Sequence, residues 1–326
     1  MNVAQLEQKW QILSSENVTS GYKSLRVSPD CLPDLYIGIN KDSKRCLILA
    51  VPKFHKVNVV RVIRENLTIE HYPEDNFIVL QLTDNSFYDL FNDLILSLHH
   101  RIKEITAADS YTTEFISGLY RWSEFFENKR FDKLSEEQIK GTFGELLFLQ
   151  YLLVHSPSHV VDDMLNTWRG PFHHAHDFVM DRKDVEIKTR EVSKSDIWIS
   201  SEFQLQPDQG KHLELLVISV QTDPTAGTSI AELVHAVRCT IREKQGDFSI
   251  LLKALSAAGL TYHSLAEYNH YRFTPVHEAV YDCIHQNFPK LITSEIPAAL
   301  TNVKYSIRLN LLSDFILSER AYSYGS

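Results

Sequence analysis

"HDFVMDRKDVEIKTR", residues 176–190, is the stretch that decides the fold of this chain. Runs with apolar residues stand on both sides of the charged segment 181–184, a pattern that predicts two strands joined by a turn. Side chains alternate between the faces of a strand, so Glu186 and Lys188 share one face. The turn folds both residues back toward Asp177. The sequence therefore predicts two carboxylates and one lysine close to a single point.

Two carboxylates beside a lysine are the side chains that metal-dependent phosphodiester cleavage requires. Mg²⁺ is usually held by one or two carboxylates, waters and substrate phosphate oxygens, and it lowers the pKa of a bound water. A neighbouring lysine can orient or deprotonate that water and can stabilise negative charge. A surface hairpin with solvated charges is the alternative, and it is favoured for the pattern in isolation. The apolar residues Val185 and Ile187, the approach segment WRGP (168–171) and Glu145 on an upstream helix favour the site.

The remaining pattern predicts an α+β protein with an N-terminal, mostly antiparallel β module. Apolar periodicity predicts helices over 3–14, 84–107, 110–130, 135–153, 229–244 and 248–258. Strands are predicted over 22–27, 34–40, 45–51, 57–63, 76–82, 175–180, 184–190, 196–203 and 212–220, and again near the C-terminus, with a loop over 156–174. Gly141 and Gly144 interrupt the helix that Ser135 is expected to cap. Each glycine costs about 1 kcal/mol against alanine, which predicts close approach of another backbone or a ligand.

The segments GTFGELLFLQ, WRGP, HDF and VEIKT together resemble the PD-(D/E)-X-K nuclease superfamily. The resemblance is carried by Gly144–Glu145, Pro171, His176–Phe178 and Val185–Thr189. It extends over nearly the whole chain to full-length bacterial PD-(D/E)XK motif proteins of restriction and defence gene clusters. The sequence departs from the pattern in two ways. The proline stands six residues before Asp177, and the run 212–220 adds a strand before the next helix.

The resemblance implies a restriction-endonuclease-like mixed β-sheet core flanked by helices. We expect this nuclease-like domain over 135–326, after a β-rich module over 1–83 and a helical connector over 84–134. The implied activity is Mg²⁺-dependent endonuclease cleavage of DNA, in which Mn²⁺ can substitute and which leaves 5′-phosphate and 3′-hydroxyl ends.

The resemblance also implies roles for particular residues. Asp177, Glu186 and Lys188 are the expected catalytic residues. The expected metal ligands are Glu145, Asp177, Glu186 and the backbone carbonyl of Ile187. Gln204 matches a glutamine that follows the third strand in some branches of the superfamily.

Arg182, Lys183, Arg190 and Lys194 form a basic cluster around the hairpin. Together with Gln204 they are candidates for DNA contacts, and a charged rim that prevents edge pairing explains the four basic residues equally well. DNA is the expected partner, and a homodimer would supply two sites for two strands. A helicase, ATPase or methylase from the same defence cluster is a further partner that the resemblance implies. A catalytically silent DNA-binding or complex-forming subunit, an RNA nuclease or other metal enzyme, and an interaction module are the alternatives.

Composition limits the remaining classes. The net charge of −9 argues against a protein that coats nucleic acid by bulk electrostatics. The four cysteines are far apart, so we expect reduced thiols. The absence of an apolar run of about 20 residues or of an apolar leader in MNVAQLEQKW predicts a cytoplasmic protein with no membrane partner. The HHAH segment (His173, His174 and His176) lacks a complete transition-metal ligand set, and loop histidines that are solvated or contact phosphate are favoured.

Overall fold

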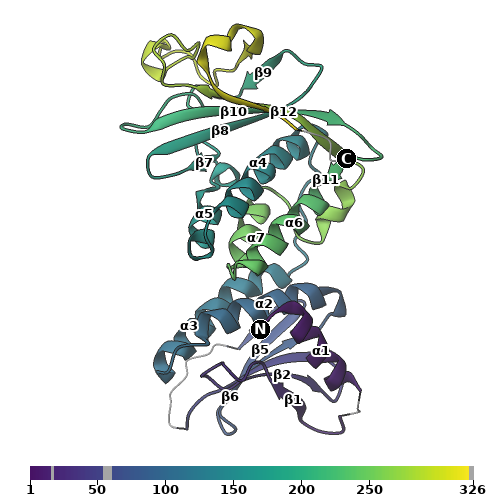
Figure 1. Cartoon of the computed structure of the whole chain (residues 1–326). Helices are drawn as coiled ribbons and strands as arrows, with labels where there is room; N and C mark the ends of the chain where they lie inside the picture. The colour runs from purple at the N-terminus through teal and green to yellow at the C-terminus, as the bar shows by residue number, and fades with distance from the viewer. Residues whose placement is uncertain (16–17, 54–60, 323–326) are drawn as a thin grey trace. The chain divides into compact units, whose positions relative to one another are not determined.

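A computed structural model describes residues 1–15, 18–53 and 61–322 (Figure 1). The chain divides into two units. Unit 1 comprises Met1–Arg130 with Asp247–Ser249, and unit 2 comprises Phe131–Gly246 with Ile250–Ser326. The division expected from the sequence, into 1–83, 84–134 and 135–326, stays a prediction.

Unit 1 contains an antiparallel sheet of six strands in the order β1-β2-β3-β6-β5-β4. The strands are β1 (Tyr22–Arg26), β2 (Leu35–Asn40), β3 (Arg45–Ala50), β4 (Val62–Ile63), β5 (Leu67–Tyr72) and β6 (Phe77–Leu82). Its helices are α1 (Val3–Ser14), α2 (Tyr88–Ile102) and α3 (Ala108–Ser123). Trp10 of α1 donates a hydrogen bond to Asn92 of α2 at 2.9 Å, which joins two helices that are far apart in sequence.

The sequence predicted most of these elements but missed β5. Only Leu67 and Ile69 of this strand are buried, and Glu70 and His71 interrupt its apolar pattern. Its identity as a strand comes instead from pairing along its whole length with β6. The strand expected over 57–63 falls mostly outside the described residues, which contain only its end as β4.

The sheet of unit 2 is mixed, as expected for an α+β protein (Figure 1). Its order is β11-β12-β10-β8-β7, with β14 also pairing with β12, and β8 and β10 are parallel while the other pairs are antiparallel. The strands are β7 (Phe178–Val179), β8 (Lys183–Glu191), β10 (His212–Thr222), β11 (Thr228–Ser229), β12 (Arg272–Asp282) and β14 (Ile316–Ala321). A second, two-stranded sheet pairs β9 (Asp196–Ile199) with β13 (Tyr305–Arg308).

The two faces of the mixed sheet are covered differently. Helices α4 (Glu136–His155), α5 (Val161–Thr167) and α6 (Ile230–Glu243) lie on one side, and β9 lies on the other (Figure 1). The remaining helix is α7 (Phe248–Ala257). On the β9 side, alternate residues of β10 join a buried apolar cluster with residues of both small strands; its members include Leu213, Leu215, Val217, Ile197, Ile199 and Ile307. The loop expected over 156–174 was wrong, because α5 and two short 3₁₀ turns occupy much of it.

Helix α4 is fixed at both ends. Ser135 caps its N-terminus as expected, and the partner in the capping box is Gln138. At the other end the ammonium group of Lys244 donates to the carbonyl oxygens of Leu153, Val154 and Ser156. These oxygens lie at a helix end, where a cation is favourable.

Of the two glycines in α4, Gly144 is the one that permits a close approach. A Cβ atom at this position would lie 1.9 Å from Oγ1 of Thr189 on β8, whereas a Cβ at Gly141 would meet nothing within 4 Å. The expectation of close packing therefore holds for Gly144 and not for Gly141. The approach brings the next residue of the helix, Glu145, toward the hairpin.

A membrane-crossing helix would need a long apolar stretch, which none of the described helices has.

Candidate active site

The β7–β8 hairpin brings the predicted residues to one place. Phe178 pairs with Val185 and Val179 with Asp184, so Asp177 stands just before β7 and opposite Glu186. Phe178 packs its ring edge-on against Phe148 of α4, with the centroids 4.8 Å apart. Because alternate residues of a strand face opposite sides, Glu186 points away from that helix-packed surface.

Asp177 and Glu145 converge beside Gly170. Oδ2 of Asp177 accepts a hydrogen bond from the backbone N–H of Ile187 at 2.7 Å, and Oε2 of Glu145 accepts one from the indole N–H of Trp168 at 2.6 Å. A Cβ atom built on Gly170 would lie 2.6 Å from Oδ1 of Asp177 and 2.9 Å from Oε2 of Glu145. Carboxylates from two separate segments therefore border one small space that exists because residue 170 has no side chain.

Asp177 also holds the approach loop through its backbone. Its carbonyl oxygen accepts hydrogen bonds from the N–H groups of Arg169 and Gly170, at 2.7 and 3.0 Å. Two main-chain hydrogen bonds therefore hold the WRGP segment against Asp177. The sequence placed this segment near the site but did not indicate the contact of Gly170 or of the Trp168 indole with Glu145.

Glu186 and Lys188 form a buried ion pair. The ammonium nitrogen lies 2.7 Å from Oε1 of Glu186, and the Glu186 side chain is almost fully buried. Apart from this ion pair, neither oxygen of Glu186 has a hydrogen-bond partner in the described part of the chain. Lys188 also donates to Oε1 of Gln204 at 3.1 Å, and the same oxygen accepts the N–H of Ser200 at 2.7 Å. Gln204 therefore helps to position the lysine through its side-chain oxygen, and its role in DNA binding stays a prediction.

Burial and neighbouring charges together shift the pKa values of Glu145, Asp177, Glu186 and Lys188. Desolvation and then the Asp177 charge raise the pKa of Glu145 to about 8. The same two causes raise the pKa of Glu186 well above its usual value, and desolvation raises that of Asp177 against the opposing effect of Lys188. For Lys188, burial lowers the pKa, but the surrounding carboxylates outweigh it and the net shift is upward. A group of carboxylates whose ionised form is this unfavourable is stabilised by a bound cation.

The residues fit a divalent ion that prefers oxygen ligands. Both oxygens of Glu186 are buried and, apart from the Lys188 ion pair, have no hydrogen-bond partner among the described residues. Two further carboxylates border the space beside Gly170. The three carboxylates are nevertheless not drawn into one tight cluster. Among the described residues, the group of three ligand atoms lying within 4.8 Å of one another is that of His176, Asp184 and Asp208.

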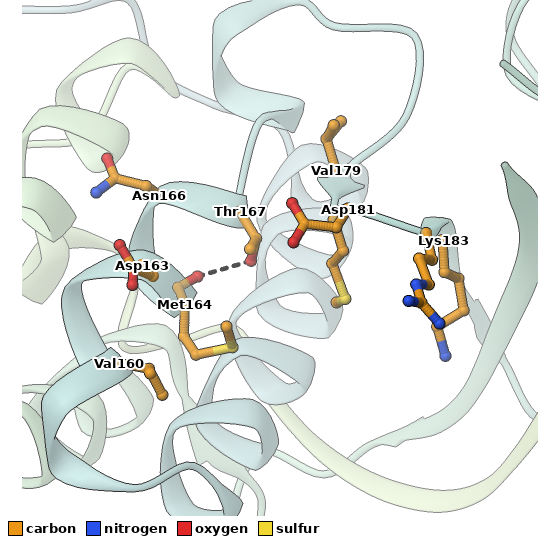
Figure 2. Close-up of a pocket in the computed structure, with 10 residues that line it drawn as sticks. Val160, Asp163, Met164, Asn166, Thr167, Val179, Asp181 and Lys183 are labelled. Carbon is orange, nitrogen blue, oxygen red and sulfur yellow. Dashed lines mark hydrogen bonds between the residues drawn. The ribbon is translucent and has the colours of Figure 1, made fainter. Parts of the chain in front are cut away.

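The basic residues expected to contact DNA do not form a single surface. Arg182 and Lys183 line a pocket of about 790 Å³ beside α5, together with Asp163, Asn166 and Asp181 (Figure 2). Lys183 is ion-paired there with Glu214 at 2.8 Å. The four carboxylate and lysine residues described above do not line this pocket.

Arg190 and Lys194 lie toward the other end of β8. At about 3.3 Å per residue, seven residues of strand separate Arg190 from Lys183 by about 23 Å. Arg190 donates to the backbone carbonyls of Glu191 and Val192, and Lys194 lies 3.4 Å from Glu137. Their role in DNA binding stays a prediction.

The family of the chain follows from a comparison with known protein families. The family described as "Putative PD-(D/E)XK family member" (DUF4420) matches residues 6–310. The chain belongs to this family. The match spans both units and includes every site residue described above, in agreement with the resemblance seen in the sequence. Neither a curated protein nor a solved structure matches the chain.

Proposed function

We propose that the chain is a divalent-metal-dependent DNA endonuclease that acts in bacterial restriction or anti-phage defence. The observation that carries the proposal is the buried set of Asp177, Glu186 and Lys188, which the hairpin gathers beside Glu145. Membership in a PD-(D/E)XK-type family supports it. Burying three carboxylates costs stability unless a cation compensates them, so a purely structural role explains the arrangement poorly.

The proposed metal ligands are Asp177, Glu186, Glu145 and the carbonyl oxygen of Ile187, with Mg²⁺ as the natural ion and Mn²⁺ as a substitute. When bound, such an ion supplies an activated water and neutralises charge on the scissile phosphate. The hydrogen bond from Ile187 N–H holds the Asp177 carboxylate, and that from Trp168 holds Glu145. Asp177 and Glu145 thus each have one carboxylate oxygen held by a hydrogen bond from the protein.

Lys188 has a defined task in this proposal. Its pKa is raised by the neighbouring carboxylates, so it carries a positive charge at neutral pH. A charged ammonium cannot remove a proton from water, but it can orient the water and stabilise negative charge on the phosphate. The hydrogen bond to Gln204 sets its direction. We therefore assign Lys188 to positioning the attacking water and stabilising negative charge on the phosphate.

The proposed substrate is duplex DNA, and a homodimer would provide one site for each strand. A helicase, ATPase or methylase from the same defence system is the class of partner that would direct cleavage.

The test is nicking of supercoiled plasmid with Mg²⁺ or Mn²⁺. Lys188→Ala and Asp177→Ala are compared with wild type, and Lys133→Ala is the control, since Lys133 is an exposed lysine that precedes α4 and has no role in the proposed site. We expect cleavage by wild type and the control that EDTA and both site substitutions abolish. Equal cleavage by all four proteins would refute the site.

Plasmid left intact by all four proteins, together with Mg²⁺ binding that Asp177→Ala does not change, would favour a catalytically silent subunit. A duplex RNA substrate in parallel separates DNA from RNA cleavage.

A further inference from the structure

A second group of ligand-type side chains lies at the start of β8, and the proposed cleavage reaction does not use it. His176, Asp184 and Asp208 each offer one ligand atom, and these atoms all lie within 4.8 Å of one another. Asp184 is 0% exposed and His176 is 2% exposed, whereas Asp208 faces solvent. The residues come from the approach to β7, from β8 and from the turn before β10, so the group joins three segments of unit 2.

The hydrogen bonds of His176 define the free nitrogen of its ring. Nε2 lies 3.1 Å from the backbone carbonyl oxygen of Gln206, which can only accept, so Nε2 carries the proton. In a neutral imidazole the other nitrogen is then unprotonated and has a lone pair available for a ligand bond. That nitrogen, Nδ1, faces Oδ2 of Asp184 at 3.5 Å. With the ring neutral, two electron-pair donors face each other in a buried place.

The carboxylate of Asp184 is a second, independent indication that this place can bind a cation. Its Oδ2 atom is inaccessible to solvent and has no hydrogen-bond partner among the described residues. The 3.5 Å separation from Nδ1 is longer than a normal hydrogen bond of roughly 2.7–3.2 Å. This separation is close to the distance of about 3.4 Å between two ligand atoms that each lie about 2.1 Å from a tetrahedral Zn²⁺.

The charges leave room for a cation. The ammonium of Lys211 lies 2.9 Å from Oδ1 of Asp184, the oxygen that faces away from the imidazole contact. Lys211 compensates one of the two carboxylates, so the group with a neutral His176 retains one negative charge. Asp208 and Lys211 share one turn, closed by a hydrogen bond from Lys211 N–H to the Asp208 carbonyl at 3.1 Å. Because Asp208 is exposed, it can move toward an ion and provides the entry side.

We propose that His176 Nδ1, Asp184 Oδ2 and the Asp208 carboxylate bind a divalent first-row transition ion such as Zn²⁺. An imidazole ligand favours such ions over Mg²⁺, and the carbonyl that holds the other ring nitrogen is the usual outer partner of a metal-bound histidine. The ion would join the turn before β10 to the start of β8 and to His176, the residue adjacent to Asp177. This site is separate from the proposed nuclease centre and does not depend on nuclease activity.

The test is Zn²⁺ binding by the full-length protein after removal of metals with EDTA. Calorimetric titration gives the affinity, and ¹⁵N NMR of labelled histidine reports whether Nδ1 of one buried ring acquires a ligand. Asp184→Asn and Asp208→Asn remove one ligand each, and the exposed Asp208 can be replaced without disturbing the core. Asp181→Asn is the matched control on the same hairpin, and Asp177→Asn reports on the nuclease centre.

We expect both ligand substitutions to weaken Zn²⁺ binding at least about tenfold, while Asp181→Asn and Asp177→Asn retain it. Unchanged affinity in Asp208→Asn and Asp184→Asn would overturn the proposal. Loss of the same Zn²⁺ ion in Asp177→Asn alone would also overturn it and assign the ion to the nuclease centre. An inactive nuclease that still binds Zn²⁺ through Asp184 and Asp208 would refute the proposed function and leave this inference standing.

Discussion

Replacing Gly170 with alanine should distort the proposed metal site without changing any charge. The new Cβ would lie 2.6 Å from Oδ1 of Asp177 and 2.9 Å from Oε2 of Glu145, both closer than non-bonded carbon and oxygen atoms approach. Neither carboxylate can retreat freely, because Ile187 holds the first and Trp168 the second by short hydrogen bonds. Loosening one hydrogen bond to a charged group costs about 1.5–3 kcal/mol. If that cost falls on the metal-binding geometry, Mg²⁺ affinity drops about 10- to 100-fold.

Calorimetric titration with Mg²⁺ measures the affinity, plasmid nicking measures the activity, and urea unfolding measures the stability. Pro171 follows the substituted residue, so a Cβ at position 170 also adds local backbone strain that lowers stability. Gly141→Ala is the matched control, because its Cβ would meet nothing within 4 Å and should stabilise α4 by about 1 kcal/mol. A folded Gly170→Ala protein that binds Mg²⁺ and cuts plasmid like wild type would refute the reasoning.

Three further predictions follow from packing and protonation. Gly144→Ala should destabilise the protein by about 1–3 kcal/mol in urea unfolding, because its Cβ would lie 1.9 Å from Oγ1 of Thr189. His99→Leu should make stability less dependent on pH between 7 and 4.5. Burial lowers the pKa of His99 to about 4, so on acidification the unfolded chain gains a proton that the folded chain resists, a loss of about 2 kcal/mol for wild type. Mg²⁺ affinity should rise from pH 6.5 to 8.5, because a Glu145 carboxyl with a pKa of about 8 must lose its proton to bind the ion; titrations of Glu145→Gln should show a shallower slope.

Each of these three has its own control. The double variant with Thr189→Ala should recover most of the stability lost in Gly144→Ala, and failure to recover would place the strain elsewhere. Equal pH slopes for wild type and His99→Leu would mean that His99 is protonated in the folded state. A Glu145→Gln protein with the wild-type slope would assign the pH dependence to other groups.

The hairpin and its residues could be predicted because their information is local. The strand period places Glu186 and Lys188 on one face, and a turn at 181–184 needs no knowledge of the remaining fold. Helices α1 and α4 could be predicted for the same reason, because their capping residues and apolar stripes lie within one short stretch of sequence. The mixed sheet came from the family resemblance, and the structure confirms it.

The features that the sequence did not show depend on contacts between distant segments. Gly170 matters because Glu145 and Asp177 approach it from different elements, and no local pattern marks that approach. Asp208 lies on a polar turn like many others, and it becomes a candidate ligand only beside His176 and Asp184. The contact of the His176 ring with the carbonyl of Gln206 likewise joins segments that are far apart in the sequence, and the same ring contacts Asp184.

The parallel pairing of β8 with β10 has a consequence for how such a protein can diverge. Parallel neighbours cannot be joined by a tight turn, so residues 192–211 must cross over the sheet between them. This crossover carries the half-exposed Phe203 and the largely exposed Trp198, while the register of β8 is set by its own pairing with β10. Substitutions at the exposed positions Trp198 and Phe203 can therefore accumulate without shifting the strand that bears Glu186 and Lys188, whereas Gln204 of the same crossover is constrained by its contact with Lys188. In the proposed nuclease, the exposed surface of the crossover can thus change while the residues of the catalytic strand are retained.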